Sequence, residues 1–187
     1  MESLLGIFSA FGLSASAGLN AYIPLLVIAL MARFTDLITL NSPWDALASW
    51  WIIGLLVILS LIEFLVDKFP VINHINDVII QSFIRPTAGA IAFAASTNVV
   101  TDINPILALA LGLLISGGVH AVKSAAIRPA ISAATGGTAN VPVSIAEDVT
   151  STTLSILSIV VPVAVMIVVA LFFTWIIWHF YLQSPQD

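Results

Sequence analysis

LSASAGLNAYIPLLVIALMA, residues 13–32, is the stretch that decides the fold. It extends an uncharged apolar run that begins near residue 4 and ends at Arg33, which is long enough for a membrane span of about 20 mostly apolar residues. Its middle nevertheless contains Gly18, Asn20 and Pro24, residue types that weaken a helix. The stretch therefore predicts a membrane helix over residues 4–32 with a weak point near its centre.

Composition places the whole chain in the same class. Hydrophobic residues make up 60% of the 187 positions, charged residues only 8%, and the mean hydropathy is +1.12. An ordinary globular domain carries about a quarter charged residues. We therefore expect an all-α fold, a polytopic transmembrane helical bundle that forms a single domain over residues 1–187.

Charge and cysteine content exclude several classes of function. Ten acidic residues stand against five basic ones, and the basic residues are too few and too scattered to form a nucleic-acid-binding patch. The chain has no cysteine, which excludes disulfides, thiol catalysis and thiolate metal sites. We expect no nucleic-acid partner and no cofactor.

The other apolar runs set the expected spans. A second span opens at Trp50, an aromatic residue typical of the membrane interface, and ends in charged residues before Pro70. Residues 71–84 predict an amphipathic helix that is too short and too polar to cross. Further spans are expected at residues 86–100, 106–122 and 152–180, the last with a kink at Pro162.

One nearly uncharged segment interrupts this series. Residues 129–146, PAISAATGGTANVPVSIA, contain a glycine pair and two prolines that a continuous helix tolerates poorly. We expect a re-entrant or broken helix there, which leaves about five full spans. If the segment crosses completely, there are six spans.

The basic residues predict the orientation. With five spans, Lys68, Arg85, Lys123 and Arg128 share one side with the N-terminus, and only Arg33 lies on the other. The positive-inside rule puts the N-terminus in the cytoplasm. The C-terminus then lies outside with five spans and inside with six.

Two interrupted segments resemble each other. Residues 13–24, LSASAGLNAYIP, align without gaps on residues 131–142, ISAATGGTANVP, and share serine, alanine, glycine and proline positions. Paired Gly/Pro-interrupted segments in the two halves of a membrane protein indicate a transporter binding site, because unwound backbone exposes polar groups. A second similarity, between FIRPTAGA and AIRPAISA, puts Arg85 and Arg128 just before prolines that we expect to start helices.

The two breaks define the expected substrate site. We expect their polar residues to line a joint site near the membrane midplane. These residues are Asn20 and Tyr22 at the first break, and Thr135, Thr138 and Asn140 at the second.

Carboxylates near the second span suggest a cation or proton site. Glu63 and Asp67 are four residues apart, so both project from one helix face. Carboxylates near hydrocarbon are costly and tend to face a cavity, a bundle interior or a partner charge. His74 and Asp77 are weak candidates for completing a metal site with them.

Structural alternatives exist for these charges. Glu63 would instead form an ion pair with Arg85 or Lys123. His120 and Lys123, three residues apart, would bind an anion or relay a proton, since imidazole titrates near neutral pH. Their alternative is that Lys123 extends to the lipid headgroups and His120 forms a hydrogen bond within the bundle.

A further acidic pair precedes the expected final helix. Glu147 and Asp148 are suited to interact with the positive end of that helix dipole, and we expect at least one of them to cap it. The other would reach the polar loop around residues 135–140.

Five motifs identify a resemblance. They are SAGLNAYIPLL, EFLVDKFP, FIRPTAGA, GGVHAVKSAAIRP and ATGGTANVPVSIAEDV, at residues 16–26, 63–70, 83–90, 117–129 and 134–149. In this order they resemble the bacterial membrane family catalogued as domain of unknown function 4126, over essentially the whole chain. The resemblance implies a multi-span bacterial membrane protein and brings no established activity.

These observations favour a small bacterial inner-membrane transporter or channel for a cation, proton or other small solute, working as a homo-oligomer within the lipid bilayer. The serines show no nucleophile elbow, the glycine-rich stretches lack a Walker lysine, and no two histidines have zinc spacing, so no motif indicates an enzyme. Two alternatives remain, a membrane-embedded lipid-modifying enzyme and an accessory or assembly subunit of a membrane complex.

Overall fold

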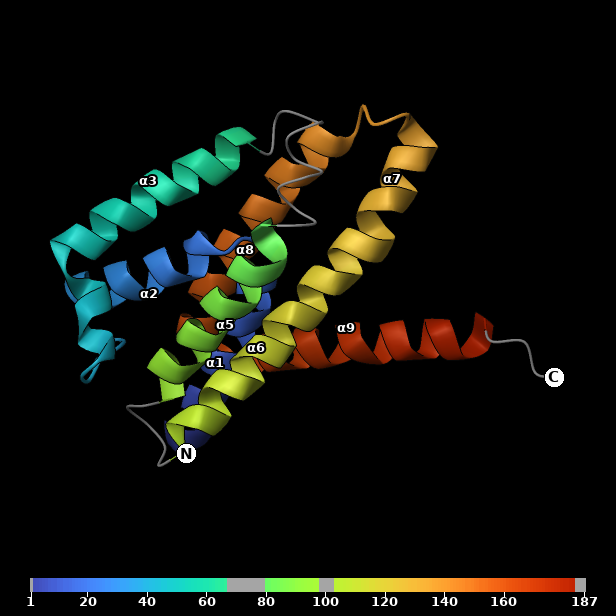
Figure 1. Ribbon diagram of the computed structural model, residues 1–187. Coiled ribbons are helices and arrows are strands. Elements are labelled where there is room, and N and C mark those ends of the chain that lie inside the picture. The colour runs from blue at the N-terminus through green and yellow to red at the C-terminus, as the bar shows by residue number, and fades with distance from the viewer. Residues whose placement is uncertain (1, 67–79, 98–102, 184–187) are drawn as a thin grey trace.

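The computed structural model describes residues 2–66, 80–97 and 103–183, and the regular elements of these residues are all helices (Figure 1). The predicted all-α fold is confirmed for this part of the chain. Two of its helices, Pro105–Thr135 and Asn140–Val160, are long and apolar enough to cross a membrane.

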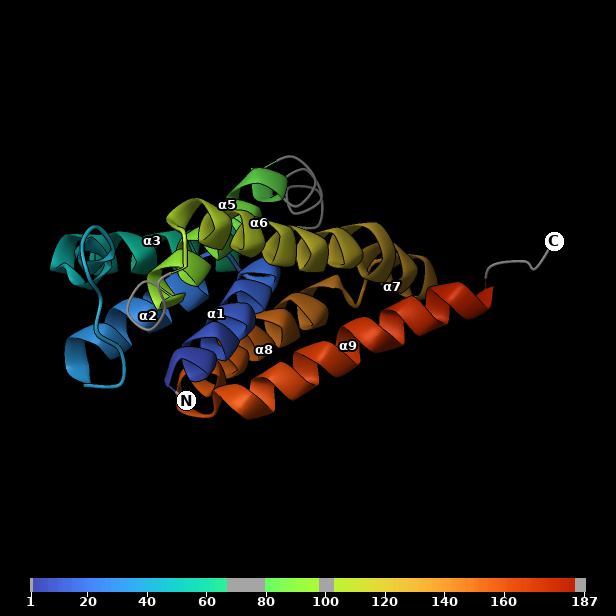
Figure 2. The ribbon, with the colours of Figure 1, turned by 90° about the horizontal axis from the view of Figure 1, so that it is seen from below.

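Helix α1 (Glu2–Leu19) forms the centre of the bundle. It packs against α5 (Gln81–Thr97), α6 (Pro105–Val122), α8 (Asn140–Val160) and α9 (Pro162–Gln183), and Figure 2 shows it between the α5–α6 and α8–α9 pairs. Most of its second half is buried because small residues allow these neighbours to approach from several sides.

The predicted weak point is a complete break. Helix α1 ends at Leu19, and α2 (Tyr22–Phe34) begins after Asn20 and Ala21. Residues 4–32 therefore form two helices, as the glycine, asparagine and proline in their middle predicted.

The next elements lie at one side of the bundle. A short 3₁₀ helix, η1 (Trp44–Ala48), connects α2 to α3 (Trp50–Val66), which packs beside α2 (Figure 1). The predicted start at Trp50 is confirmed. Helix α3 buries only Ile53, Leu56 and Glu63, so its outer face is broadly apolar and exposed.

Helices α5 and α6 cross closely through small residues. A Cβ atom added to Gly89 would collide with the Ser116 side chain, and one added to Gly112 would collide with backbone atoms of Gly89 and Ala90. Small residues at the crossing let the two helix backbones approach closely.

The expected start of this helix at residue 86 is wrong. Helix α5 begins at Gln81, five residues earlier, and Pro86 lies inside it. A proline in the second turn removes one intrahelical hydrogen bond, which the packing of α5 against α1 and α6 offsets.

The helix predicted at residues 106–122 is confirmed as the α-helix α6, but the helical run does not stop at its end. Helix α6 continues through a π-helical turn, η3 (Lys123–Ile127), into α7 (Arg128–Thr135) as one helical run of 31 residues. Pro129 lacks an N–H and crowds the carbonyl four residues before it, and the wider π turn preceding it accommodates the ring.

The second break is therefore shorter than residues 129–146. Helix α7 ends at Thr135, and the chain turns at Gly136 and Gly137, whose φ angles are 59° and 86°. These are left-handed conformations that glycine adopts without strain. Helix α8 begins immediately afterwards at Asn140.

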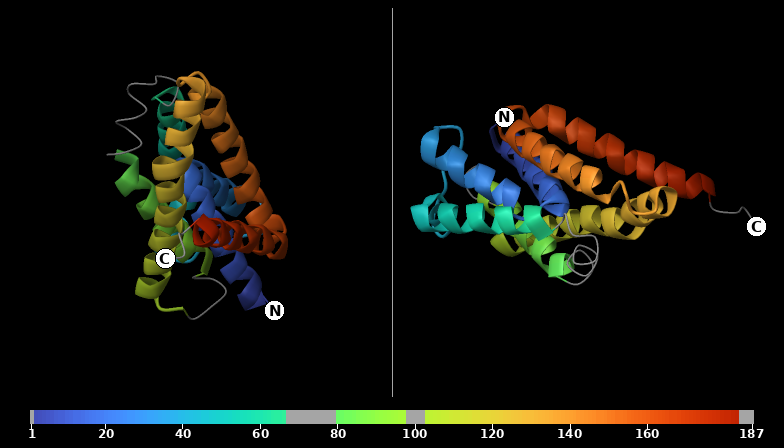
Figure 3. Two further views of the ribbon diagram at one scale, coloured as in Figure 1. Left: turned by 90° about the vertical axis from the view of Figure 1, so that its right-hand side faces the viewer. Right: turned by 90° about the horizontal axis from the view of Figure 1, so that it is seen from above.

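Two helices replace the single span expected at residues 152–180. Helix α8 ends at Val160, Val161 is non-helical with φ −137° and ψ 63°, and α9 begins at Pro162. Proline disfavours helical backbone at the preceding residue, so Pro162 starts a helix rather than kinking one. Helix α9 then extends away from the bundle towards the C-terminus (Figures 2 and 3).

The sequence repeat is reflected in the helix boundaries. Helices α2 and α8 begin at Tyr22 and Asn140, which are 118 positions apart, since 140 − 22 = 118. Pro24 and Pro142 have the same separation, since 142 − 24 = 118, and each is the third residue of its helix. Both repeat units thus consist of a helix end, a break and a new helix that carries proline in its first turn.

Candidate functional site

The break between α1 and α2 is organised by one side chain. Asn20 is 2% exposed, and its Oδ1 accepts hydrogen bonds of 3.1 Å from the backbone N–H groups of both Tyr22 and Ile23. Its Nδ2 donates to Asp148 Oδ1 on α8 at 2.9 Å. Asn20 thereby accepts hydrogen bonds from backbone N–H groups at the start of α2 and links the break to α8.

Two basic side chains bind the other side of the break. Arg85 Nη1 donates to the carbonyl of Gly18 at 3.3 Å, and Lys123 Nζ donates to the carbonyl of Leu19 at 3.1 Å. The last carbonyls of a helix lack intrahelical partners and form the negative end of its dipole. The C-terminal end of α1 is thus neutralised by two cations of the protein itself.

Arg85 also holds α3 to the bundle. Its Nη2 lies 3.0 Å from Glu63 Oε1, with side-chain exposures of 0% and 1%, and its Nε donates to Gln81 Oε1 at 3.3 Å. The Arg85 carbonyl accepts a hydrogen bond of 2.7 Å from Ser116 Oγ on α6. The alternative that Glu63 pairs with Arg85 is confirmed.

Glu147 on α8 links Lys123 to a third cation, Arg128. Its Oε2 lies 3.0 Å from Lys123 Nζ, while Arg128 binds both carboxylate oxygens, Oε1 through Nε at 3.2 Å and Oε2 through Nη2. The expectation that Lys123 extends to the headgroups is wrong, because its side chain is 1% exposed inside the bundle.

The expected capping role of the acidic pair is wrong as well. Glu147 and Asp148 lie within α8, which begins at Asn140, and not ahead of a helix that begins near residue 152. The glycine turn at Gly136 and Gly137 reverses the chain early enough for the helix to include both carboxylates.

Buried charges of both signs lie around the break. Among the residues that the structure describes, three carboxylates and three cations lie there, and the five of them in described ion pairs expose at most 11% of their side chains. Low-dielectric surroundings tolerate charges only when each finds an opposite charge and hydrogen bonds. We call this set the buried charge cluster, and it comprises Glu63, Arg85, Lys123, Arg128, Glu147 and Asp148.

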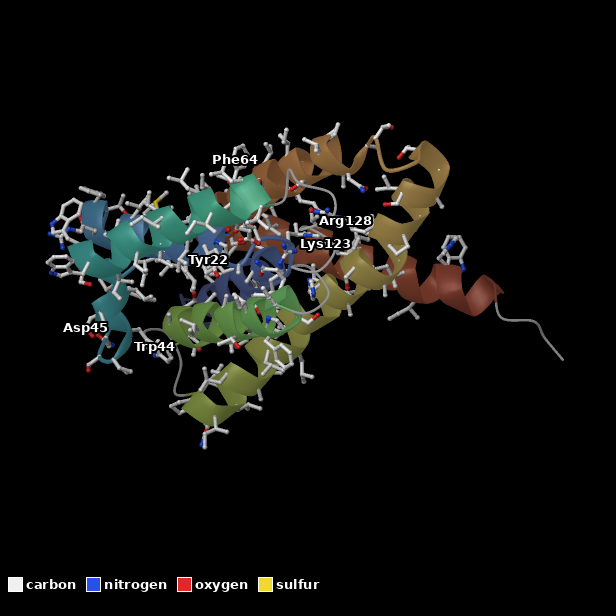
Figure 4. The ribbon with its side chains drawn as sticks, turned by 45° about the horizontal axis from the view of Figure 1, so that its top comes forward. Tyr22, Trp44, Asp45, Phe64, Lys123 and Arg128 are labelled. Carbon is white, nitrogen blue, oxygen red and sulfur yellow. The ribbon has the colours of Figure 1, made fainter. Side chains whose placement is uncertain are left out.

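Figure 4 shows how part of the cluster lies. The Lys123 and Arg128 labels stand close together beside the long α6–α7 run, and Tyr22 lies on the α2 side of the same region. Tyr22 is partly buried and packs against the hydrophobic core next to the break.

His120 lies one turn before Lys123. It is 3% exposed, and its Nε2 lies 3.3 Å from Ser82 Oγ on α5. The alternative of a hydrogen bond within the bundle is confirmed.

The expected orientation rested on basic residues in loops. Arg85, Lys123 and Arg128 instead lie inside the bundle at 0%, 1% and 9% exposure. The positive-inside rule counts loop charges near span ends, so these residues do not contribute to it.

The structure does not bring the two breaks together. Thr135 and Thr138 are exposed and donate to the nearby carbonyls of Ile131 and Thr135, and Asn140 Oδ1 accepts a 3.0 Å hydrogen bond from Ser132. Figures 1 and 3 show the α7–α8 turn at one end of the bundle, away from the α1–α2 junction. On α8, the first break contacts Asp148 and not the α7–α8 turn.

The weak metal site cannot be placed in full. Asp67, His74 and Asp77 lie outside the described residues, and Glu63 is bound to Arg85. Within residues 2–66, 80–97 and 103–183, no group of three or more His, Cys, Asp or Glu could hold a metal ion.

A group of serines between α1 and α8 was not predicted from the sequence. Ser16 Oγ lies 2.8 Å from Ser151 Oγ and 2.7 Å from Ser155 Oγ, and all three residues are fully buried. The feature of the sequence that indicates this group is the spacing of Ser151, Ser155 and Ser158, which places three hydroxyls on one face of α8.

Comparison with known proteins assigns the chain to a family. No curated protein and no solved structure matches it. A family model described as "Domain of unknown function (DUF4126)" matches residues 7–181, nearly the whole chain. The resemblance carried by the five motifs is therefore confirmed, and the chain belongs to this family.

Proposed function

We propose that this protein is a small transporter or channel of the bacterial inner membrane that moves a proton or a small cation. The observation that carries the proposal is the buried charge cluster at the break between α1 and α2. It places three carboxylates and three cations within a helical bundle whose outer surface is largely apolar.

The cost of such a cluster supports a functional role. Ionisable groups within membrane helices are expensive to bury, and they mark ion pathways and proton relays more often than structural sites. The ion pair between Glu63 and Arg85 alone would fix α3, and Glu147 needs only one cation for neutrality. Glu147 is bound by two cations, and Arg85 and Lys123 also bind carbonyl groups at the end of α1. These contacts exceed what helix packing requires.

The break supplies the second element of a pathway. Discontinuous helices in transporters present backbone carbonyls and N–H groups to ions and substrates near the membrane centre. Here the break occurs in α1, the central helix, and its two ends are bound by side chains from three other helices, α5, α6–η3 and α8. A modest movement of any of them would change the polar groups that the break exposes.

Hydroxyl groups extend the polar region along α1. Ser16 meets Ser151 and Ser155 one turn from the break, and Ser9 donates to the Ser158 carbonyl farther towards the N-terminus of α1. Polar groups thus follow the α1–α8 interface from the charge cluster, which supports a route along this interface.

The membrane location rests on the apolar surface. The two long helices α6–α7 and α8 have the length of spans. Trp50 and Trp51 are exposed at the start of α3, where interfacial aromatics are enriched, and Trp175 and Trp178 are exposed in the C-terminal half of α9. The bacterial inner membrane is what the family resemblance implies. The transported partner would be a small ion or solute.

Flux through proteoliposomes tests the proposal. The purified chain is reconstituted with luminal indicators for pH, Na⁺, K⁺ and divalent cations, and gradients are imposed in turn. We expect at least one ion to move faster than in protein-free vesicles and the Glu63→Gln variant to lose that flux.

The matched control is Asp45→Asn, the same chemical change at an exposed carboxylate in η1. It should retain parental flux, and size-exclusion chromatography should show both variants to be folded and monodisperse. Absence of flux for every ion tested would contradict the proposal.

A further inference from the structure

The ammonium group of Lys123 has an unusual environment for a lysine. Its Nζ lies 3.1 Å from the carbonyl oxygen of Leu19 and 3.0 Å from Glu147 Oε2, and the side chain is 1% exposed. Leu19 is the last residue of α1, so its carbonyl has no partner further along the helix. The ammonium therefore sits at the negative end of a broken helix, against a carboxylate.

These oxygen atoms are ligands suited to a metal cation. Carbonyls of unwound helices and the C-terminal ends of half-helices coordinate Na⁺ and protons in membrane transporters. A compact point charge such as an ammonium group fits the same electrostatic position. The ammonium group of Lys123 thus occupies the position that a bound metal cation would take.

We infer that Lys123 is the proton-carrying group of the pathway, and that the species moved is a proton because the lysine ammonium fills the place of a metal ion. This inference rests on the proposed function and names its substrate. In the transfer step an N–H bond of the ammonium breaks and an O–H bond forms on the Glu147 carboxylate. The products are a neutral amine and a neutral carboxylic acid, and the positive charge of Arg128 beside the Glu147 carboxyl group is unchanged.

The second cation at the break has a different role. Arg85 binds the adjacent Gly18 carbonyl and the Glu63 carboxylate, but a guanidinium group does not release its proton in proteins. Arg85 is therefore a positioning residue that holds the end of α1. Lysine, in contrast, can change its protonation state when buried.

Other charged and titratable groups surround this pair on every packed element. Arg128 on α7 binds Glu147 and keeps the carboxylate in place, and Asp148 on α8 binds Asn20 next to Leu19. The remaining groups among the described residues are His120 on α6, Arg85 on α5 and Glu63 on α3.

The π turn that accommodates the Pro129 ring also positions Lys123. Lys123 is the first residue of the π-helical turn η3. Single π turns within α-helices are rare and occur frequently at functional sites. Here the turn places Lys123 and Arg128 so that both reach Glu147 on the neighbouring helix.

Two substitutions at this position test the inference in the full chain. Lys123→Arg keeps a permanent cation that cannot titrate. Lys123→Met removes the charge at similar length and leaves the oxygen atoms of Leu19 and Glu147 without the ammonium. Lys123→Gln replaces the methionine variant where that variant does not fold.

The first arm measures proton flux in proteoliposomes under a potential set by K⁺ and valinomycin. We expect Lys123→Arg to lower the proton flux by roughly tenfold or more while it remains monodisperse, since its guanidinium cannot release a proton. Proton flux at the parental rate in this variant would overturn the inference.

The second arm measures thermal unfolding in detergent, with NaCl compared against choline chloride at equal ionic strength. We expect Na⁺ to raise the unfolding temperature of Lys123→Met by a few degrees, because an ion that binds only the folded state stabilises it. The parent and Lys123→Arg should show no Na⁺-specific shift. No shift in Lys123→Met would overturn the inference.

The second arm needs no transport, so the two proposals fail separately. A parent chain that moves no ion, together with Na⁺-stabilised Lys123→Met, would contradict the proposed transport function and retain the cation site.

Discussion

Arg85 Nη2 lies 3.0 Å from Glu63 Oε1, and the two side chains expose 0% and 1% of their surface. Removing one member of a buried ion pair leaves the other charge uncompensated, which costs about 3–5 kcal/mol. We predict that Arg85→Met lowers the free energy of unfolding by about that amount. The double variant Glu63→Leu/Arg85→Met should recover most of the loss, as measured by denaturant unfolding in mixed micelles. Single-variant costs that simply add in the double variant would contradict the pairing.

The hydrogen bond between Asn20 and Asp148 leads to a second prediction about stability. Asn20→Asp retains an oxygen that can accept from the amides of Tyr22 and Ile23 but places a carboxylate against Asp148. We predict a loss of at least about 2 kcal/mol in unfolding free energy, because an interhelical hydrogen bond is replaced by like-charge repulsion.

Asn104 is the matched control for this substitution. It is exposed and caps α6 by accepting from the Ile106 amide at 2.9 Å. Aspartate caps helices about as well as asparagine, so Asn104→Asp should change stability by only a few tenths of a kcal/mol. Equal costs at positions 20 and 104 would contradict the assigned contact with Asp148.

The crossing of α5 and α6 predicts a contrast between two glycines. A Cβ atom at Gly89 would collide with Ser116, whereas a Cβ at Gly54 on α3 meets nothing within 4 Å. We predict that Gly89→Ala costs about 1–3 kcal/mol through overpacking, while Gly54→Ala is neutral or stabilising because alanine favours helix. Thermal unfolding in detergent measures both variants. A tolerant Gly89→Ala would contradict the close approach of the two helices.

Some of this structure followed directly from the sequence. The break at Asn20 was predicted because glycine, asparagine and proline cluster inside an otherwise uniform apolar run, and local propensity decides such a position. The start of α3 at Trp50 followed from interfacial aromatics after a proline turn. These features depend on neighbouring residues alone.

The errors have a common physical origin. Pro86 was expected to start a helix, but the packing of α5 keeps it inside one. Pro129 does stand at the start of α7, but a π turn joins α7 to α6 without a break. The roles of Lys123 and Glu147 could not be predicted for the same reason. Their pairing depends on how α8 docks against α6, which no spacing within one segment specifies.

The serine group between α1 and α8 gives a milder prediction. Ser16→Ala removes hydrogen bonds to Ser151 and Ser155, and interhelical bonds of this kind contribute about 0.6 kcal/mol on average in membrane proteins. We predict a loss of about 1 kcal/mol or less in unfolding free energy, together with reduced ion flux. Ser124→Ala, at a half-buried serine with a local bond to the Ala121 carbonyl, should change neither quantity. Unchanged flux in Ser16→Ala would contradict a route along this interface.

In the proposed pathway ions pass through the buried charge cluster, and Glu147 is bound to both Lys123 and Arg128. Potential-driven proton flux is measured into proteoliposomes that contain the parent chain, Glu147→Gln or the surface control Asp45→Asn. We predict parental flux above that of protein-free vesicles, the same flux in Asp45→Asn, and background flux in folded Glu147→Gln. Parental flux in Glu147→Gln would show that ions do not pass through the cluster.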